Sequence, residues 1–191
     1  MKKTHRDLPG SVRIIGGKWR GRGLPVGNIA GLRPTPDRVR ETLFNWLAPV
    51  IVRSRCLDLF AGTGALGFEA ASRGAAEVIL IERDPRLARI LEEQSLKLGA
   101  QEVTVVCAKA LEWLKGPASA FDVVFLDPPF GQGLLGPCCE QLEARNWLKP
   151  GAWIYLETER ALLSPPIPPH WRIERAKQAG QVRYYLARSH V

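Results

Sequence analysis

Long apolar runs are absent from this chain of 191 residues. No stretch of about 18 consecutive apolar residues occurs, so no segment is suited to cross a membrane as a helix. The first seven residues are basic, but no apolar signal core follows them, which argues against export. We therefore expect a cytoplasmic protein that makes no contact with a membrane.

Cysteine is scarce, with only Cys56, Cys107, Cys138 and Cys139 in the chain. None of these residues forms a Cys-x-x-Cys pair, and neighbouring cysteines rarely bridge to each other. The spacing excludes the common zinc motifs and fits a reduced chain. We expect no structural disulfide and no metal site.

The remaining composition is that of an ordinary globular protein, with 46% hydrophobic and 24% charged residues. The length favours one domain, or one domain with a small appendage. Charge is distributed unevenly. Residues 1–40 contain ten Lys or Arg and two acidic residues, whereas residues 41–191 contain 17 of each, so the net charge of +8 lies in the N-terminal fifth.

A basic segment attached to a neutral body favours contact with a polyanion such as nucleic acid. The alternative is a solvated tail that only improves solubility. Glycines and Trp19 are interleaved with the charges, which favours the polyanion contact over a featureless run of lysines.

The N-terminal region contains two predicted elements. Residues 12–26 alternate around Gly16-Gly17, which predicts a basic β-hairpin or an extended arm. After a loop, Thr35 is a candidate N-cap with Pro36 at the first helical position. The helix that follows has an apolar stripe, and we expect it to cover one end of the core. Its apolar positions are Val39, Leu43, Trp46, Leu47 and Val50.

From Arg55 onward, short apolar strands alternate with helices. The predicted strands are 56–60, 78–81, 103–107, 121–126, 153–157, 171–176 and 182–187. The predicted helices are 65–72, 85–98, 110–114 and 134–145. Apolar strands joined by helices predict an α/β fold with a parallel sheet covered on both faces, closed by an antiparallel hairpin.

In such sheets, ligands bind at the carboxyl ends of the strands. The first strand is followed by Gly62, Gly64 and Gly67 in the pattern G-x-G-x-x-G, and Glu82 ends the second strand. The glycines let backbone approach a ligand closely, and the carboxylate can hold two ribose hydroxyls. The pattern predicts a nucleoside cofactor but leaves NAD and S-adenosylmethionine open, with a tight turn that binds nothing as the alternative.

Two further features favour S-adenosylmethionine. Asp58, directly before the glycine loop, would repel a pyrophosphate but suits the ammonium group of a methionine moiety. The segment Asp127-Pro128-Pro129-Phe130 follows the fourth strand and has a chemical meaning for methyl transfer but none for hydride transfer. A turn with a buried Phe is its alternative interpretation.

The exocyclic amine of a base is a poor nucleophile because its lone pair is delocalised into the ring. The Asp127 carboxylate and the Pro128 carbonyl would accept from its N–H groups and draw the lone pair out of the plane. Asp127 could also take the departing proton. Pro128 and Pro129 fix the turn, and Phe130 offers a face for stacking. Catalysis would then be largely positioning.

Four blocks in this order resemble the bacterial RsmD family over nearly the full chain. They are Arg13–Arg22, Leu32–Thr35 with Arg38–Leu47, Leu57–Gly67 and Asp127–Phe130. Those enzymes methylate the N2 amine of one guanine in 16S ribosomal RNA of the small subunit. The resemblance implies a class I S-adenosylmethionine-dependent methyltransferase fold, which is Rossmann-like, with a seven-stranded, mostly parallel sheet and an antiparallel C-terminal strand.

The resemblance also implies a cofactor site. Asp58 and the glycines would line its methionine end, Glu82 would hold the ribose and Arg83 would lie beside the adenine. Lys109 departs from the family, which often has Asp or Asn there; because Lys lacks an acceptor, backbone at Ala108 or Ala110 would contact the adenine. The predicted set is Asp58, Phe60, Gly62, Thr63, Gly64, Glu82, Arg83, Ala108, Lys109, Ala110 and Asp127.

The predicted RNA contacts are Arg13, Lys18, Arg20, Arg22, Arg33, Thr35 and Arg38. The first four would grip phosphates, and the segment from Arg33 to Arg38 would close over the cofactor and the target base. Trp19 either stacks on a base or packs the hairpin, and packing is the favoured interpretation. The target base must be turned out of its loop to reach Asp127, which is least costly in a single strand.

We expect residues 1–32 to form an RNA-contacting arm and residues 33–191 the methyltransferase domain. The protein would act as a monomer on ribosomal RNA in the small subunit or in an assembly intermediate. Two alternatives stay open: an adenine-N6 methyltransferase acting on DNA or RNA, and a non-catalytic RNA-binding assembly factor. A NAD dehydrogenase fits only the glycine loop.

Overall fold

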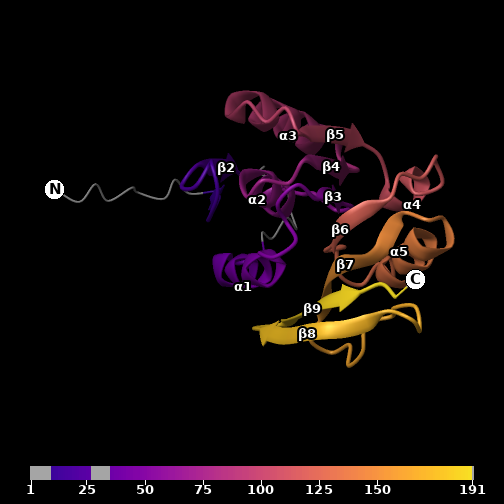
Figure 1. The fold of residues 1–191 in the computed structure, drawn as a ribbon. Coiled ribbons are helices and arrows are strands. Elements are labelled where there is room, and N and C mark those ends of the chain that lie inside the picture. The colour runs from indigo at the N-terminus through magenta and orange to yellow at the C-terminus, as the bar shows by residue number, and fades with distance from the viewer. Residues whose placement is uncertain (1–9, 27–34, 191) are drawn as a thin grey trace.

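The computed structural model describes residues 10–26 and 35–190 of the chain. Its centre is a seven-stranded sheet in the order β5-β4-β3-β6-β7-β9-β8 (Figure 1). The strands are β3 (Arg55–Asp58), β4 (Glu77–Glu82), β5 (Val103–Cys107), β6 (Phe121–Leu126), β7 (Leu148–Glu159), β8 (Arg172–Ala179) and β9 (Val182–Arg188). In the described residues, no helix combines the length and apolar character needed to cross a bilayer.

The direction of the strands agrees with the prediction. Strand β9 pairs antiparallel with β7 and β8, and the other neighbouring strands are parallel. The chain proceeds outward from β3 through β4 to β5 and then returns to β6 on the other side of β3. The strand order therefore reverses between β3 and β6, which is where open α/β sheets bind ligands.

Helices cover both faces of the sheet (Figure 1). On one face lie α1 (Asp37–Leu47), α2 (Ala65–Ser72) and α3 (Pro85–Leu98), which contribute Phe44, Phe68 and Leu91 to one buried cluster. On the other face lie α4 (Ala110–Trp113) and α5 (Leu135–Ala144), which belong to a second cluster. Two apolar layers thus leave only the strand ends for polar chemistry.

The predicted capping of the first helix is wrong. Pro36 occupies the N-cap of α1, the helix begins at Asp37, and no side chain caps it. Thr35 is buried one residue earlier. Its hydroxyl donates to Asp127 instead of accepting from the helix N–H groups, so a polar side chain expected to start a helix reaches the end of β6.

The predicted N-terminal β-hairpin is confirmed by antiparallel pairing of β1 (Ser11–Arg13) with β2 (Gly23–Pro25). The hairpin packs against the same buried cluster as α1 and α2. Trp19 is only 8% exposed, which confirms its packing role. The separate action of residues 1–32 as an arm stays a prediction.

Glu69 anchors the hairpin to α2. Its fully buried carboxylate accepts from the backbone N–H groups of Ile15 at 2.7 Å and Gly16 at 2.8 Å. Arg73 Nε donates to it at 2.7 Å, and Arg40 Nη1 lies 3.7 Å away. Gly17, at φ +76°, lies so close that a Cβ would stand 1.8 Å from the Ser72 carbonyl oxygen. A basic segment is thus held against the core by a buried ionic network.

Candidate active site

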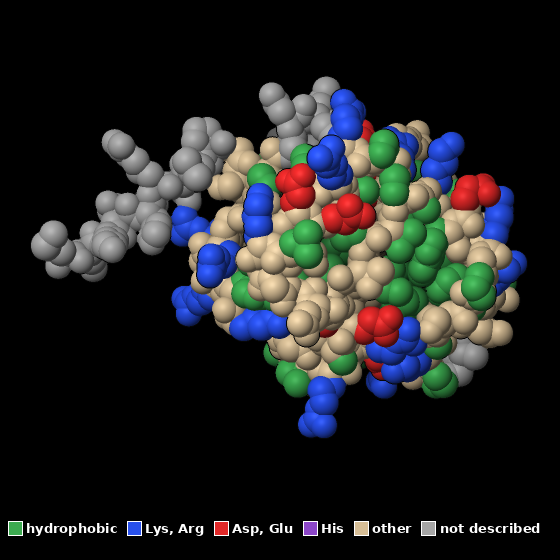
Figure 2. Space-filling view, turned by 90° about the horizontal axis from the view of Figure 1, so that it is seen from above, with side chains coloured by type: hydrophobic (Ala, Val, Ile, Leu, Met, Phe, Trp, Pro, Cys, Tyr) green, Lys and Arg blue, Asp and Glu red, His purple; other side chains and the backbone are tan. Residues whose placement is uncertain are grey.

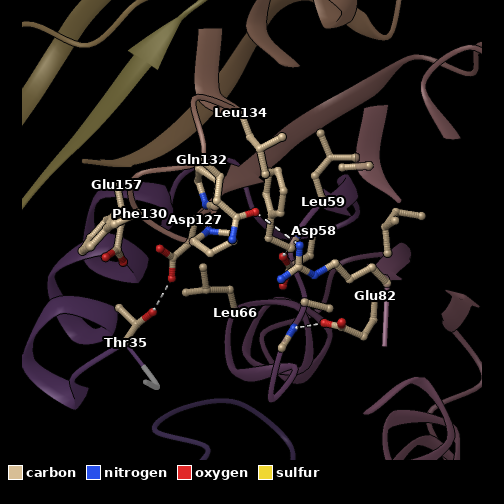
Figure 3. Close-up of a pocket in the computed structure, with 18 of the residues that line it drawn as sticks. Thr35, Asp58, Leu59, Leu66, Glu82, Asp127, Phe130, Gln132, Leu134 and Glu157 are labelled. Atoms are coloured by element: carbon tan, nitrogen blue, oxygen red, sulfur yellow. Dashed lines mark hydrogen bonds between the residues drawn. The ribbon is translucent and has the colours of Figure 1, made fainter. Parts of the chain in front are cut away.

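A cavity of about 1330 Å³ opens at the carboxyl ends of β3 to β7. Figure 3 shows Thr35, Phe130 and Glu157 gathered around Asp127 at one end, while Glu82 lies at the other end. Asp58 lies between these two groups. The sequence-predicted residues from separate strands therefore meet in one space, with a target-side end and a cofactor-side end.

The glycine loop shapes the cofactor side. Gly62 and Gly64 have φ of +53° and +75°, in the left-handed region that glycine tolerates best. A Cβ on Gly64 would lie 2.6 Å from the Phe68 ring, and one on Gly67 would lie 2.1 Å from Leu80 Cδ2. Gly67 thus lets α2 pack tightly on β4, while the first two glycines turn the backbone along the cavity.

Glu82 is oriented by backbone. Its Oε2 accepts from the Gly62 N–H at 2.9 Å and its Oε1 accepts from the Asp84 N–H at 2.8 Å. Each carboxylate oxygen keeps a second lone pair for a ligand donor. The geometry suits recognition of two adjacent hydroxyl groups, as predicted for a ribose.

Asp58 is 1% exposed at the end of β3. The pKa of this carboxyl is raised to about 7, mainly by burial and also by the nearby carboxyls of Asp127 and Glu82, while the hydrogen bond from the Phe60 N–H acts in the opposite direction. Neither Asp58 nor Glu82 forms an ion pair with another described residue. A cationic ligand would relieve this repulsion, so the donor set fits an amino acid ammonium and a neighbouring sulfonium.

The rim of the cofactor side has two basic residues. Arg83 Nη1 donates to Gln132 Oε1 at 3.2 Å, which joins the loop after β4 to the loop after β6. Lys109 is exposed after β5 and also lines the cavity. The Ala108 N–H already donates to the Glu82 carbonyl at 3.0 Å. An adenine contact from Ala108 would therefore have to use its carbonyl.

Asp127 follows β6 at the target side. The Thr35 hydroxyl donates to its Oδ2 at 3.2 Å. Burial raises the pKa of Asp127, and this hydrogen bond acts in the opposite direction. Pro128 is buried, whereas Phe130 is 46% exposed and lines the cavity. The arrangement offers a fixed acceptor beside an accessible aromatic ring.

Sequence reasoning missed Glu157, which lies on β7 and is 4% exposed. Strand β7 pairs in register with β6, Leu156 opposite Leu126, so Glu157 and Asp127 are the next residues on neighbouring strands. Burial and the Asp127 charge raise the pKa of Glu157. The available signal was the carboxylate at the end of the predicted strand 153–157.

The predicted RNA contacts are placed in two regions. Arg20 and Arg22 are exposed on the hairpin, and Arg38 is exposed in the first turn of α1. Lys18 forms an ion pair with Glu102, directly before β5, and its Nζ lies 4.3 Å from the Trp19 ring. Because Glu102 precedes β5, Lys18 lies near the amino ends of the strands, at the end of the sheet opposite the cavity. Arg33 lies outside the described residues.

On the face that Figure 2 shows, the positive side chains are spread rather than gathered in one patch. Figure 2 shows Lys and Arg side chains around the periphery of one face, with apolar side chains gathered between them. Arg13 belongs to the hairpin, and its carbonyl accepts from Arg40 Nη2 at 2.7 Å. The structure leaves RNA contact by these residues a prediction.

Solved structures define the class of this protein. YhhF from Escherichia coli, provisionally described as a methyltransferase, matches with a TM-score of 0.89 and 48% identity, covering 95% of this chain and 99% of that one. An RNA methyltransferase from Salinibacter ruber, solved with S-adenosyl-L-homocysteine, shares the fold with a TM-score of 0.63 at 19% identity, covering 83% and 94% of the two chains. The chain has the class I methyltransferase fold, and the predicted cofactor, S-adenosylmethionine, is confirmed as the cofactor of this class.

Sequence comparisons assign the chain to one family within this fold class. A family model described as "Conserved hypothetical protein 95" matches residues 12–188. The chain is 50% identical over 186 residues to "Ribosomal RNA small subunit methyltransferase D" of Escherichia coli K12, covering 97% of this chain and 94% of that protein. The protein of the same name from Haemophilus influenzae is 50% identical over 192 residues, covering 97% and 98%. The chain belongs to this methyltransferase family, the RsmD family that its sequence blocks resemble.

Proposed function

We propose that this protein transfers a methyl group to the exocyclic N2 amine of a guanine in the RNA of the small ribosomal subunit. The observation that carries the proposal is Asp127, held by Thr35 at the end of β6 beside the exposed ring of Phe130. A fixed carboxylate next to a stacking surface suits a planar amine better than a hydroxyl or a ring carbon.

The cofactor side supplies the electrophile. S-adenosylmethionine, when bound, provides a methyl carbon whose bond to sulfur breaks, with its electron pair staying on sulfur, as the amine nitrogen forms a new bond. Asp58 would pair with the ammonium group, and Glu82 would hold the ribose hydroxyls. Both carboxylates are already oriented by backbone N–H groups of the loops after β3 and β4, so binding requires little reorganisation.

The target side of the cavity would position the base and supply an acceptor for the amine protons. Asp127 and the Pro128 carbonyl would accept from the two N–H groups of the amine and so favour the out-of-plane lone pair. One N–H proton must leave after transfer, and the raised pKa of Asp127 makes this carboxylate a suitable acceptor. Phe130 would stack on the extruded base.

Ribosomal RNA as the substrate is supported by the names of the relatives and by exposed basic residues of the N-terminal region. The small-subunit methyltransferases of two bacteria match 97% of this chain. Arg20, Arg22 and Arg38 are exposed and would contact phosphates. Arg20 and Arg22 lie on the hairpin, which the hydrogen bonds to Glu69 anchor to α2.

The direct test is labelled methyl transfer to small subunits from a strain that lacks this gene. The RNA is then digested and its nucleosides are identified by mass spectrometry. N2-methylguanosine at a single position is the expected product. N6-methyladenosine, or label on duplex DNA alone, would replace the proposal with an adenine methyltransferase. Binding of S-adenosylhomocysteine without transfer to free RNA or particles would indicate a non-catalytic assembly factor.

A further inference from the structure

Glu157 is a buried carboxyl with no role in the proposed methyl transfer. It lies beside Asp127 on the neighbouring strand and lines the main cavity. It also lines an adjoining cavity of about 440 Å³, whose other lining residues include Phe130, Leu134 and Pro166. The carboxyl therefore faces the space that a base stacked on Phe130 would occupy.

Glu157 is held in place by one short hydrogen bond. The hydroxyl of buried Tyr155 donates to its Oε1 at 2.5 Å. The Thr35 hydroxyl lies close enough to interact with Glu157 as well as with Asp127. Glu157 forms no ion pair with any other described residue. A buried carboxyl without a cation is costly, and such groups are frequent at functional sites.

The protonation state of Glu157 follows from its surroundings. Burial is the main cause that raises its pKa, the Asp127 charge adds to it, and the bonds from Tyr155 and Thr35 oppose it. The carboxyl is consequently favoured in its neutral form near pH 7. A neutral carboxyl carries one hydrogen-bond donor and one strong acceptor side by side.

Guanine presents a matching edge. Its N2 amine, N1–H and O6 follow one another along the Watson–Crick edge, as donor, donor and acceptor. Adjacent strands are about 4.8 Å apart, so the carboxyls of Asp127 and Glu157 can engage neighbouring positions of one base. With the amine at Asp127 and the Watson–Crick edge turned toward β7, N1–H and O6 of guanine would face Glu157.

We propose that Glu157 is the residue that selects guanine, accepting from N1–H through its carbonyl oxygen and donating through its hydroxyl to O6. This inference rests on the proposed N2 methylation and adds the group that identifies the base. Adenine with its N6 amine at Asp127 would present a ring acceptor and then a C–H, so one of the two bonds would be lost. Tyr155 and Thr35 act as positioning residues for the carboxyl.

A base analogue separates selection from catalysis. 2-Aminopurine keeps the 2-amine that is methylated but lacks both N1–H and O6. Small subunits are reconstituted with guanine or 2-aminopurine at the nucleotide mapped for the wild-type protein, and kcat/KM is measured for each. A site built around hydrogen bonds rejects an analogue lacking them strongly, so we expect the wild type to prefer guanine by at least about 100-fold.

Three variants complete the test. Glu157→Leu should lower kcat/KM on guanine about 100-fold while changing the rate on 2-aminopurine less than about threefold, so the preference collapses. Glu157→Gln keeps a donor and an acceptor and should retain most of the preference. Glu140→Gln, at an exposed position of α5, is the matched control. All variants should bind S-adenosylhomocysteine with the wild-type Kd, which also reports correct folding.

The outcomes are distinguishable. Equal losses on both bases in Glu157→Leu would reduce Glu157 to a structural role and overturn the inference. Equal wild-type rates on guanine and 2-aminopurine would overturn it even if Glu157→Leu did not fold. Failure of the wild type to form N2-methylguanosine would instead remove the proposed function itself, before any Glu157 variant is compared.

Discussion

The hydroxyl of Thr35 donates a hydrogen bond to Oδ2 of Asp127 over 3.2 Å, across 92 residues of sequence. The bond joins the residue before the N-cap of α1 to the end of β6 (Figure 3). It also fixes the rotamer of the carboxylate on which the proposed mechanism depends. The start of α1 is thereby part of the target side of the cavity.

Removal of this hydroxyl should change the pH dependence of methyl transfer. The Thr35 bond lowers the pKa of Asp127, so Thr35→Val should raise that pKa and move the acidic limb of kcat/KM to higher pH. We expect a loss of roughly tenfold at pH 7, the value of one hydrogen bond to a charged group. Thr35→Ser should restore the profile. An unchanged acidic limb in Thr35→Val would contradict the coupling.

Cofactor affinity should depend on pH through Asp58. An ammonium group binds the ionised carboxylate, whereas burial raises the pKa of Asp58 to about 7. The carboxyl is ionised at pH 8 and increasingly protonated below pH 7. The affinity for S-adenosylhomocysteine should therefore decrease as the pH falls below 7, with a slope that approaches about tenfold per pH unit. Calorimetry between pH 5.5 and 8 measures this dependence. The Asp58→Asn variant should bind S-adenosylhomocysteine more weakly, with an affinity that does not change with pH. A constant wild-type Kd over this range would contradict the role of Asp58.

The positive charges on the hairpin should affect the binding of RNA but not the binding of the cofactor. Arg20→Ala combined with Arg22→Ala should weaken binding to the small subunit and lower the slope of log K against log salt by about 2 if both contact phosphates. Arg89→Ala with Lys97→Ala, exposed on α3, removes the same charge elsewhere. Equal losses in the two double variants would show that only net charge matters.

Glu69 should dominate the stability of the hairpin attachment. Glu69→Ala removes the buried carboxylate 3.7 Å from the guanidinium of Arg40, which keeps its ion pair with Asp37. The substitution also leaves the N–H groups of Ile15 and Gly16 without their acceptor. We expect the free energy of unfolding to fall by about 3–5 kcal/mol in urea titrations. Glu93→Ala, half exposed on α3, should change it by less than about 0.5 kcal/mol. Similar losses for the two variants would contradict the anchoring role.

Much of the fold follows from local sequence signals. Apolar strands alternating with helices predict the parallel sheet, and the strand-end rule places Asp58, Glu82 and Asp127 at one edge. These signals succeed because the hydrophobic pattern sets which faces are buried, and the sheet topology then fixes which ends meet. The positions of the three carboxylates were therefore predictable without coordinates.

The remaining features depend on contacts between distant segments. The Glu69 anchor joins α2 to a hairpin more than 50 residues earlier, and nothing local distinguishes this Glu from a surface one. Thr35 resembles a helix cap in sequence because caps and buried hydroxyls use the same residue types. Glu157 is different, since the strand-end rule applied to the fifth predicted strand would have identified it.

The most direct test of the central claim is single-turnover methyl transfer by Asp127→Asn on small subunits that lack the modification. The amide keeps the size of the side chain but loses the charge and the proton acceptor, so we expect the rate of N2-methylguanosine formation to fall by at least about 100-fold. Affinity for S-adenosylhomocysteine should stay within about threefold of wild type, because Asp58 and Glu82 supply the main cofactor contacts. A rate within twofold of wild type would contradict the account.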